Sequence, residues 1–139
     1  MNKSFQVFLF STMSILLVAA AIYIFFLSEK PKANDEPTVE EILELSVDIP
    51  EITTNLSSDH YINIAFKIQT DRKDAKKELE KREFQVNNII IKHLSSLEAK
   101  DILTTEGKIQ LEQSIKEKIN AILQNGKVEQ VYITSCIIQ

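Results

Sequence analysis

The chain has 139 residues, a length that favours a single folded domain, and it carries 16 Lys and Arg against 20 Asp and Glu. The net charge of −4 argues against a nucleic-acid-binding protein, which requires a basic surface, and one cysteine excludes an intrachain disulfide. Residues 1–28 contain one charged side chain, residues 29–56 are strongly acidic, and residues 57–139 are nearly balanced. The chain therefore has three compositional zones.

The first zone contains an uncharged segment of 23 residues, 5–27, with the sequence FQVFLFSTMSILLVAAAIYIFFL. A helix of this length reaches about 35 Å and could cross a hydrocarbon core of about 30 Å. A cleavable signal peptide is the alternative, but six strongly apolar residues follow the only small-residue site, Ala19–Ala21. We therefore expect residues 5–27 to be an uncleaved membrane anchor that follows a short N-terminus of residues 1–4. Lysines flank both ends, so their count does not fix its orientation.

Residues 28–50 begin as a polar linker, and all three prolines of the chain lie in this segment. Apolar residues alternate near its end, which allows a first strand there, at Leu43, Leu45, Val47 and Ile49. The folded domain is predicted over residues 51–139. It begins with a hairpin of Ile52–Leu56 and Tyr61–Thr70, joined by a turn rich in Ser and Asp.

Residues 71–103 then change to helical periodicity, with Asp71 as a suitable N-cap. Charge dominates the first three turns, whereas apolar residues form a stripe further on, at Leu79, Val86, Ile90, Leu94 and Leu97. This pattern predicts one long helix whose first half projects beyond the core. A second helix is predicted to start at Thr104 or Thr105 and to end at Gly126.

The final segment, KVEQVYITSCIIQ, predicts a closing strand. Strict alternation places Val131, Ile133 and Ile137 on one face. It places Tyr132, Cys136 and Ile138 on the other. Both faces are apolar, so we expect both to be covered. The element order β-β-α-α-β predicts an α+β domain with a small, mostly antiparallel sheet.

No catalytic, cofactor-binding or metal-binding residue is predicted. His60 and His93 are 33 positions apart, and neither has metal-ligand spacing to the single Cys136. Two glycines are too few for a phosphate-binding loop. Cys136 lies within a predicted strand, where a structural thiol is expected. These features predict that the protein is not an enzyme.

Two regions are candidate interaction sites. The charged run of the first helix is either a solvated helix face or a docking surface for an adjacent subunit or ion-channel partner, and its basic residues are Lys73, Lys76, Lys77, Lys81 and Arg82. The second region is the closing strand, whose candidate contact residues are Tyr132, Ile133, Cys136 and Ile138.

Several short motifs resemble the FliL family of flagellar basal-body-associated proteins over about residues 51–139. They are Asn55-Leu56, Leu94-Ser95-Ser96, Glu106-Gly107-Lys108, Ile119-Asn120, and Val131-Tyr132-Ile133-Thr134 closing on Gln139. The chain departs from the family pattern at Asn87-Asn88, where an Arg-Asp pair is frequent. It departs also at Ser135 and Cys136, where an acidic and an aromatic residue are usual.

The resemblance implies a single-pass protein of the bacterial inner membrane, held in lipid by residues 5–27, with a cytoplasmic N-terminus and an extracytoplasmic domain. It implies a fold similar to the stomatin/prohibitin (SPFH) domain. It further implies a homo-oligomeric ring around the stator proteins MotA and MotB, contacts with other basal-body components, no cofactor, and support of motor torque or swarming. Two alternatives unrelated to motility are a stomatin-type membrane scaffold and a single-pass extracytoplasmic sensor or binding module.

Overall fold

The computed structural model describes residues 6, 12–14, 16–23 and 37–139. Residues 6, 12–14 and 16–23 are helical, with exposed side chains. The rest of the predicted anchor and residues 28–36 of the predicted linker lie outside the described residues, so the anchor stays a prediction. Within the part of the chain that is described, no helix is both long enough and apolar enough to cross a membrane.

The folded unit comprises Pro37–Gln139, and it opens with a short helix that was not predicted, α2 (Val39–Glu44). A capping box explains where this helix starts. The Thr38 hydroxyl accepts a hydrogen bond from the Glu41 N–H at 3.2 Å, and the Glu41 carboxylate accepts one from the Thr38 N–H at 3.0 Å. Leu43, the first residue of the alternating apolar pattern, therefore lies in a helix and not in the strand that the pattern allowed.

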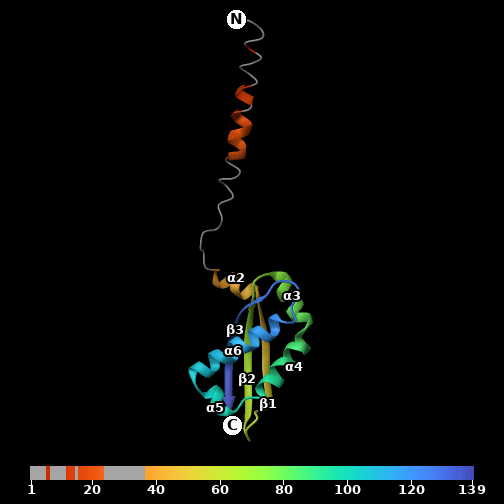
Figure 1. The fold of residues 1–139 in the computed structure, drawn as a ribbon, viewed down its shortest axis with the longest axis vertical. Helices are drawn as coiled ribbons and strands as arrows, with labels where there is room; N and C mark the ends of the chain where they lie inside the picture. Colours follow the sequence, from red (N-terminus) through yellow and green to blue (C-terminus); the bar gives the residue numbers. More distant parts are fainter. Residues whose placement is uncertain (1–5, 7–11, 15, 24–36) are drawn as a thin grey trace. The chain divides into compact units, whose positions relative to one another are not determined.

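Three antiparallel strands form one sheet in the order β1-β2-β3 (Figure 1). The strands are β1 (Ser46–Asn55), β2 (Tyr61–Thr70) and β3 (Val128–Ile138). The predicted α+β class, antiparallel sheet and hairpin are confirmed. β1 starts within the predicted linker and continues to Asn55, with a register shift between Ile49 and Ile52. Pro50 is tolerated because it lies at this bulge on an edge strand.

Four helices lie between β2 and β3, rather than the two predicted: α3 (Lys73–Lys81), α4 (Glu83–Leu94), α5 (Ala99–Leu103) and α6 (Thr105–Asn120). The prediction of one helix over 71–103 is wrong, because Arg82 separates α3 from α4 and residues 95–98 separate α4 from α5. The prediction of a projecting first half is also wrong. Ala75 and Leu79 of α3 are fully buried, so the charged half of the predicted helix packs on the sheet.

Side-chain caps set the boundaries of these helices. Thr104 caps α6 as predicted, since its hydroxyl accepts from the Gly107 N–H at 3.0 Å. Asp71 does not cap α3. Its carboxylate instead accepts hydrogen bonds from Arg72 and from the Lys127 N–H, which joins the start of α3 to the loop before β3. That loop contains Gly126, whose φ of 85° suits glycine.

α6 ends at Asn120 and not at Gly126, because the Asn120 side chain binds the start of β3. Its amide oxygen accepts from the Val128 N–H at 2.7 Å, and its amide nitrogen donates to the Val128 carbonyl at 3.2 Å. This two-way contact fixes the seven-residue connection between the helix and the strand.

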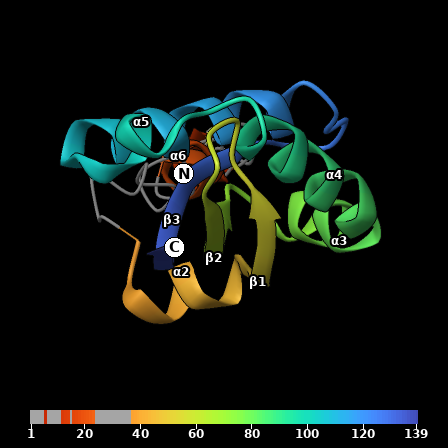
Figure 2. The same ribbon diagram turned by 90° about the horizontal axis from the view of Figure 1, so that it is seen from below.

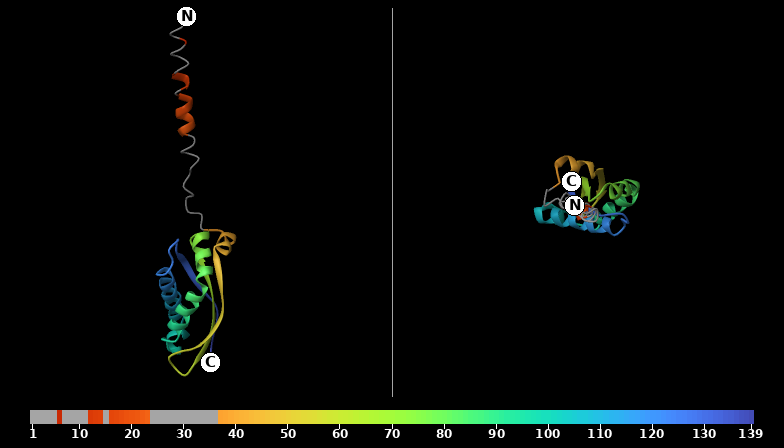
Figure 3. Two further views of the ribbon diagram at one scale, coloured as in Figure 1. Left: turned by 90° about the vertical axis from the view of Figure 1, so that its right-hand side faces the viewer. Right: turned by 90° about the horizontal axis from the view of Figure 1, so that it is seen from above.

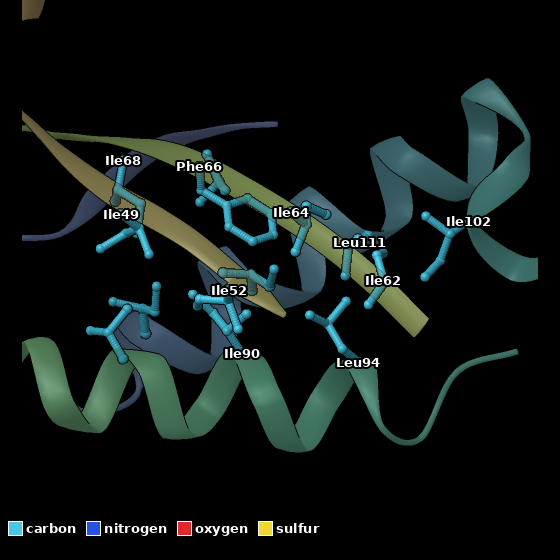
Figure 4. Packing of buried hydrophobic residues seen from close by; sticks show 14 of the residues in the cluster. Ile49, Ile52, Ile62, Ile64, Phe66, Ile68, Ile90, Leu94, Ile102 and Leu111 are labelled. Atoms are coloured by element: carbon cyan, nitrogen blue, oxygen red, sulfur yellow. The ribbon is translucent and has the colours of Figure 1, made fainter. Parts of the chain in front are cut away.

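The helices α3 to α6 cover one face of the sheet, and α2 lies on the other side of the sheet from α6 (Figures 2 and 3). Side chains from the sheet and from α4, α5 and α6 meet between the two layers (Figure 4). The largest fully buried ones include Ile62, Ile64, Phe66, Ile68, Ile90, Leu94, Ile102, Leu111, Ile115 and Ile119. Their burial provides the main stabilisation of the fold.

A bulge in β3 overturns the predicted facing of its second half. Phe66 pairs with Ile133 but Ala65 pairs with Ser135, so Thr134 is an extra residue in β3. An extra residue moves every later side chain to the opposite face. Cys136 and Ile138 therefore pack against the core with Ile133, whereas Ile137 is exposed.

Candidate interaction surfaces

Two lysines of the charged run are engaged within the molecule. Lys73 donates to the Glu44 carboxylate at 2.8 Å, and Lys76 donates to the Glu44 carbonyl at 3.0 Å. The hydrogen bond and the charge of Lys73 lower the pKa of the Glu44 carboxyl. Thr70 adds a third link, since its N–H and its hydroxyl both donate to the Leu45 carbonyl. These contacts hold α2 against the start of α3.

Arg82 and Glu78 are engaged in the same way. Arg82 pairs with the Glu78 carboxylate at 2.8 Å, and that carboxylate also accepts from the backbone N–H groups of Gln124 and Asn125. Burial raises the pKa of Glu78, but the hydrogen bonds from Arg82, Asn125 and Gln124 outweigh it and lower the pKa overall. The side chains of Glu78 and Arg82 are 12% and 26% exposed, so this pair is structural.

Lys77 and Lys81 remain as the free cations of the predicted docking surface, because neither forms an ion pair within 37–139. Both line a surface hollow of about 450 Å³, together with Asp74, Glu78 and Asn125. The charged run thus divides between contacts that build the domain and a smaller solvated patch.

The predicted contact residues of β3 also divide. Ile133, Cys136 and Ile138 pack against the core. Burial raises the pKa of the Cys136 thiol, and the charge of Lys108 opposes this rise only in part. A raised thiol pKa is typical of an unreactive structural cysteine. Tyr132 alone points outward, is 40% exposed, and donates from its hydroxyl to the Gln69 amide oxygen at 3.1 Å.

The face of the sheet opposite the helices carries Tyr132 together with two side chains that were not predicted. Tyr61 is 63% exposed and Ile137 is 53% exposed. Polar cross-strand contacts surround them, including the Lys67–Asp48 ion pair at 2.6 Å. The exposure of Ile137 was not predicted, because the outward direction of its side chain depends on the bulge at Thr134.

A groove between α4 and the carboxyl-terminal end of α6, including the turn that follows α6, is the second unpredicted surface. It consists of two adjoining hollows that share Ile89. One hollow, of about 420 Å³, is lined by Phe84, Gln85, Asn88, Ile89 and Ile122. The other, of about 340 Å³, is lined by Ile89, Lys92, His93, Ser96 and Lys118. We call the two together the α4–α6 groove. It has an apolar end and a basic end.

Electrostatics at the basic end follow from these neighbours. Burial and the nearby charge of Lys118 lower the pKa of His93. Among the described residues, neither Lys92 nor Lys118 forms an ion pair. At the apolar end Phe84 is 72% exposed. Phe84 directly follows the charged run of the sequence, and this isolated apolar residue was the one local signal that pointed to the surface.

The described residues offer no group of three or more His, Cys, Asp or Glu side chains that could hold a metal ion. His60 lies in the β1–β2 turn, and its ring contacts the Ser58 hydroxyl at 3.2 Å. The same turn is bound to the α4–α5 connection and to the start of α5, because the Ser57 N–H donates to the Leu97 carbonyl and the Ala99 N–H donates to the Ser58 hydroxyl. These residues build the fold.

Exposed apolar side chains beside charged ones are typical of a surface that binds another protein. Comparison with known proteins identifies the class. Residues 46–139 match the family described as flagellar basal body-associated protein FliL. The chain is 43% identical over 122 residues to the flagellar protein FliL of Bacillus subtilis (strain 168), covering 88% of this chain and 87% of that relative.

A more distant relative is the flagellar protein FliL of Aquifex aeolicus (strain VF5). The chain is 33% identical to it over 79 residues, which cover 57% of this chain and 49% of that relative. The chain therefore belongs to the FliL family, as the resemblance predicted.

Family membership establishes association with the flagellar basal body and a role alongside the flagellar motor. The family consists of structural or accessory motor components and is not a known family of enzymes. The two alternatives unrelated to motility are set aside on this ground. Flagellar components are accordingly the partners to consider for the exposed surfaces.

Proposed function

We propose that this protein is a non-enzymatic accessory of the flagellar stator, which binds MotA and MotB and supports torque under load or swarming as a ring-forming homo-oligomer. Residues 5–27 anchor it in the inner membrane, with the N-terminus in the cytoplasm and Pro37–Gln139 outside. The observation that carries this proposal is the family match over 46–139. The uncharged segment of 23 residues that precedes the matched region adds support.

The domain is proposed to resemble the stomatin/prohibitin domain and to meet its partners through surfaces that its own fold leaves free. Of the predicted contact residues, Lys77, Lys81 and Tyr132 are exposed and suit this role. Lys73, Lys76 and Arg82 act mainly within the domain, and Ile133, Cys136 and Ile138 pack against the core, so all six would influence partners indirectly.

A deletion strain tests the proposed role in torque. Swimming speed and swarm expansion are measured in media of increasing viscosity, with the intact gene restored in trans as the control. We expect the deletion to reduce motility most at high viscosity while flagella remain assembled. Unchanged swimming and swarming at every viscosity would contradict the proposal.

Cysteine labelling tests the proposed topology. Both variants carry Cys136→Ser, and one adds Asn2→Cys while the other adds Glu106→Cys at the exposed start of α6. An impermeant maleimide is applied to intact spheroplasts and to lysed ones. We expect label at position 106 in intact spheroplasts and at position 2 only after lysis. The reverse pattern would place the domain in the cytoplasm.

A further inference from the structure

α2 exposes apolar side chains that nothing in its own domain covers. Val39 is 67% exposed and Leu43 is 54% exposed, and no residue of α2 is buried. These two residues are four positions apart, so they lie on the same face of the helix. Glu40 is exposed beside them and forms no ion pair among the described residues. α2 therefore presents a short apolar stripe flanked by negative charge.

The α4–α6 groove has the complementary character. Its apolar end exposes Phe84, and its basic end carries Lys92 and Lys118 without ion-pair partners in the described part of the chain. A six-residue helix such as α2 is about 9 Å long. Its two exposed apolar side chains could fill the apolar hollow, of about 420 Å³, while Glu40 faces the lysines.

We infer that α2 of one copy binds in the α4–α6 groove of a second copy of this chain. This inference rests on the proposed homo-oligomer and names the surfaces that form it. The two surfaces cannot meet within one domain, because α2 and α6 lie on opposite sides of the sheet (Figures 2 and 3). Two different surfaces on opposite sides give a head-to-tail interface, which generates a ring when the rotation closes.

The contacts around Glu44 explain why α2 is suited to this role. The last residue of α2, Glu44, is bound by Lys73 and Lys76, and the residue after it is bound by Thr70. The helix is therefore held in place before any partner binds. A binding element that is ordered in advance loses less entropy on association. The charged run of α3 thus contributes to assembly by positioning α2.

Disulfide trapping in full-length protein in native membranes tests the inference. The chain carries Cys136→Ser, Leu43→Cys and Phe84→Cys, and is treated with copper phenanthroline. We expect a ladder of covalent dimers, trimers and higher oligomers on a non-reducing gel, with either single cysteine variant giving dimers at most. The matched control replaces Phe84→Cys by Leu103→Cys on α5, which is 65% exposed and outside the groove, and no ladder is expected.

Charge reversal gives an independent readout. Glu40→Lys and Lys118→Glu should each reduce the yield of trapped oligomer at least severalfold, and the double reversal should restore it, because the attraction is re-formed with exchanged signs. Lys108→Glu, on exposed α6 surface outside the groove, is the control and should leave the yield unchanged.

The possible results test the proposed interface and the proposed homo-oligomer separately. An oligomer that persists in native membranes while position 84 traps no second copy, or traps a different protein, would overturn the inference and leave the proposed ring intact. Failure of the double reversal to restore trapping would also overturn the inference. A chain that is monomeric in its native membrane would remove both the interface and the ring.

Discussion

The start of α3 and the α4–α6 groove both display lysines, yet the two regions use them differently. At the start of α3, Lys73 and Lys76 bind Glu44 and its carbonyl, so their charge is satisfied within the domain. In the groove, Lys92 and Lys118 have no ion-pair partner among the described residues and lie near exposed apolar side chains. Charge density alone therefore does not distinguish the two regions, and the proposed docking surface rests instead on unpaired charge beside exposed apolar surface.

The largest effect that would sharpen this comparison is expected from Leu79→Ala. Leu79 is 1% exposed beneath the charged face of α3, and removing a buried leucine side chain costs about 2–5 kcal/mol. Phe84→Ala, five residues further on, removes a larger side chain that is 72% exposed and should cost about 0.5 kcal/mol or less. Urea unfolding of both full-length variants measures the difference. Equal losses would mean that the charged half of the helix does project from the core.

Gly126→Ala is expected to destabilise the domain by about 1–3 kcal/mol, because a non-glycine residue is strained at a φ of 85°. Its Cβ would also meet the Asp71 carboxylate and the Ala75 Cβ. The neighbouring exposed Gln124→Ala, whose backbone contact to Glu78 is retained, serves as the control and should change stability little. Thermal unfolding of both variants checks the expectation, and an unaffected Gly126→Ala protein would exclude a tight α3–loop contact.

Glu78→Gln should change how stability depends on acid. The pKa of Glu78 is lowered in the folded state, so its contribution is complete above the unfolded value of 4.5 and is lost as the pH falls below it. The variant should therefore lose stability at pH 7 and show a shallower decline below pH 4.5. Glu44 and Asp71 also have lowered pKa values, so some decline will remain. Lys77→Gln is the control, and an identical acid profile for both variants would contradict a structural role of Glu78.

The smallest effect concerns His93. Its folded pKa lies below the unfolded value of 6.5, so the domain loses stability as the pH falls from 6.5 toward the folded pKa. This pH range lies above the range in which the lowered pKa values of the carboxylates affect stability. His93→Gln should remove the decline in the upper range only. Stability is measured by urea unfolding at half-unit steps of pH between 7.5 and 5, and a decline that persists in the variant would assign it to other groups.

Much of the fold was predictable because long, periodic segments dominate it. β2 was predicted with its observed bounds, Tyr61–Thr70, since apolar and polar residues alternate there without interruption. The start of α6 was predictable from the capping residue Thr104. β1 and β3 were harder, because each contains a bulge, and a single inserted residue reverses the facing that alternation predicts.

The prediction of one helix over residues 71–103 was wrong for a different reason. The periodicity of residues 71–103 continues across Arg82, so the pattern does not reveal the break between α3 and α4. The surroundings of the candidate contact residues could not be predicted, because they depend on distant parts of the chain. Whether Lys73 is free is decided by Glu44, 29 positions away. The groove likewise joins Phe84 to Ile122, and no local pattern indicates that these two residues meet.

The most direct test of the central claim is quantitative copurification of the full-length chain from native membranes. The chain is recovered after mild solubilisation, and the amounts of MotA, MotB and the chain itself are measured by mass spectrometry. The proposal predicts that both stator proteins are recovered with several copies of the chain for each stator unit. Recovery of the chain as a monomer without either stator protein would contradict it.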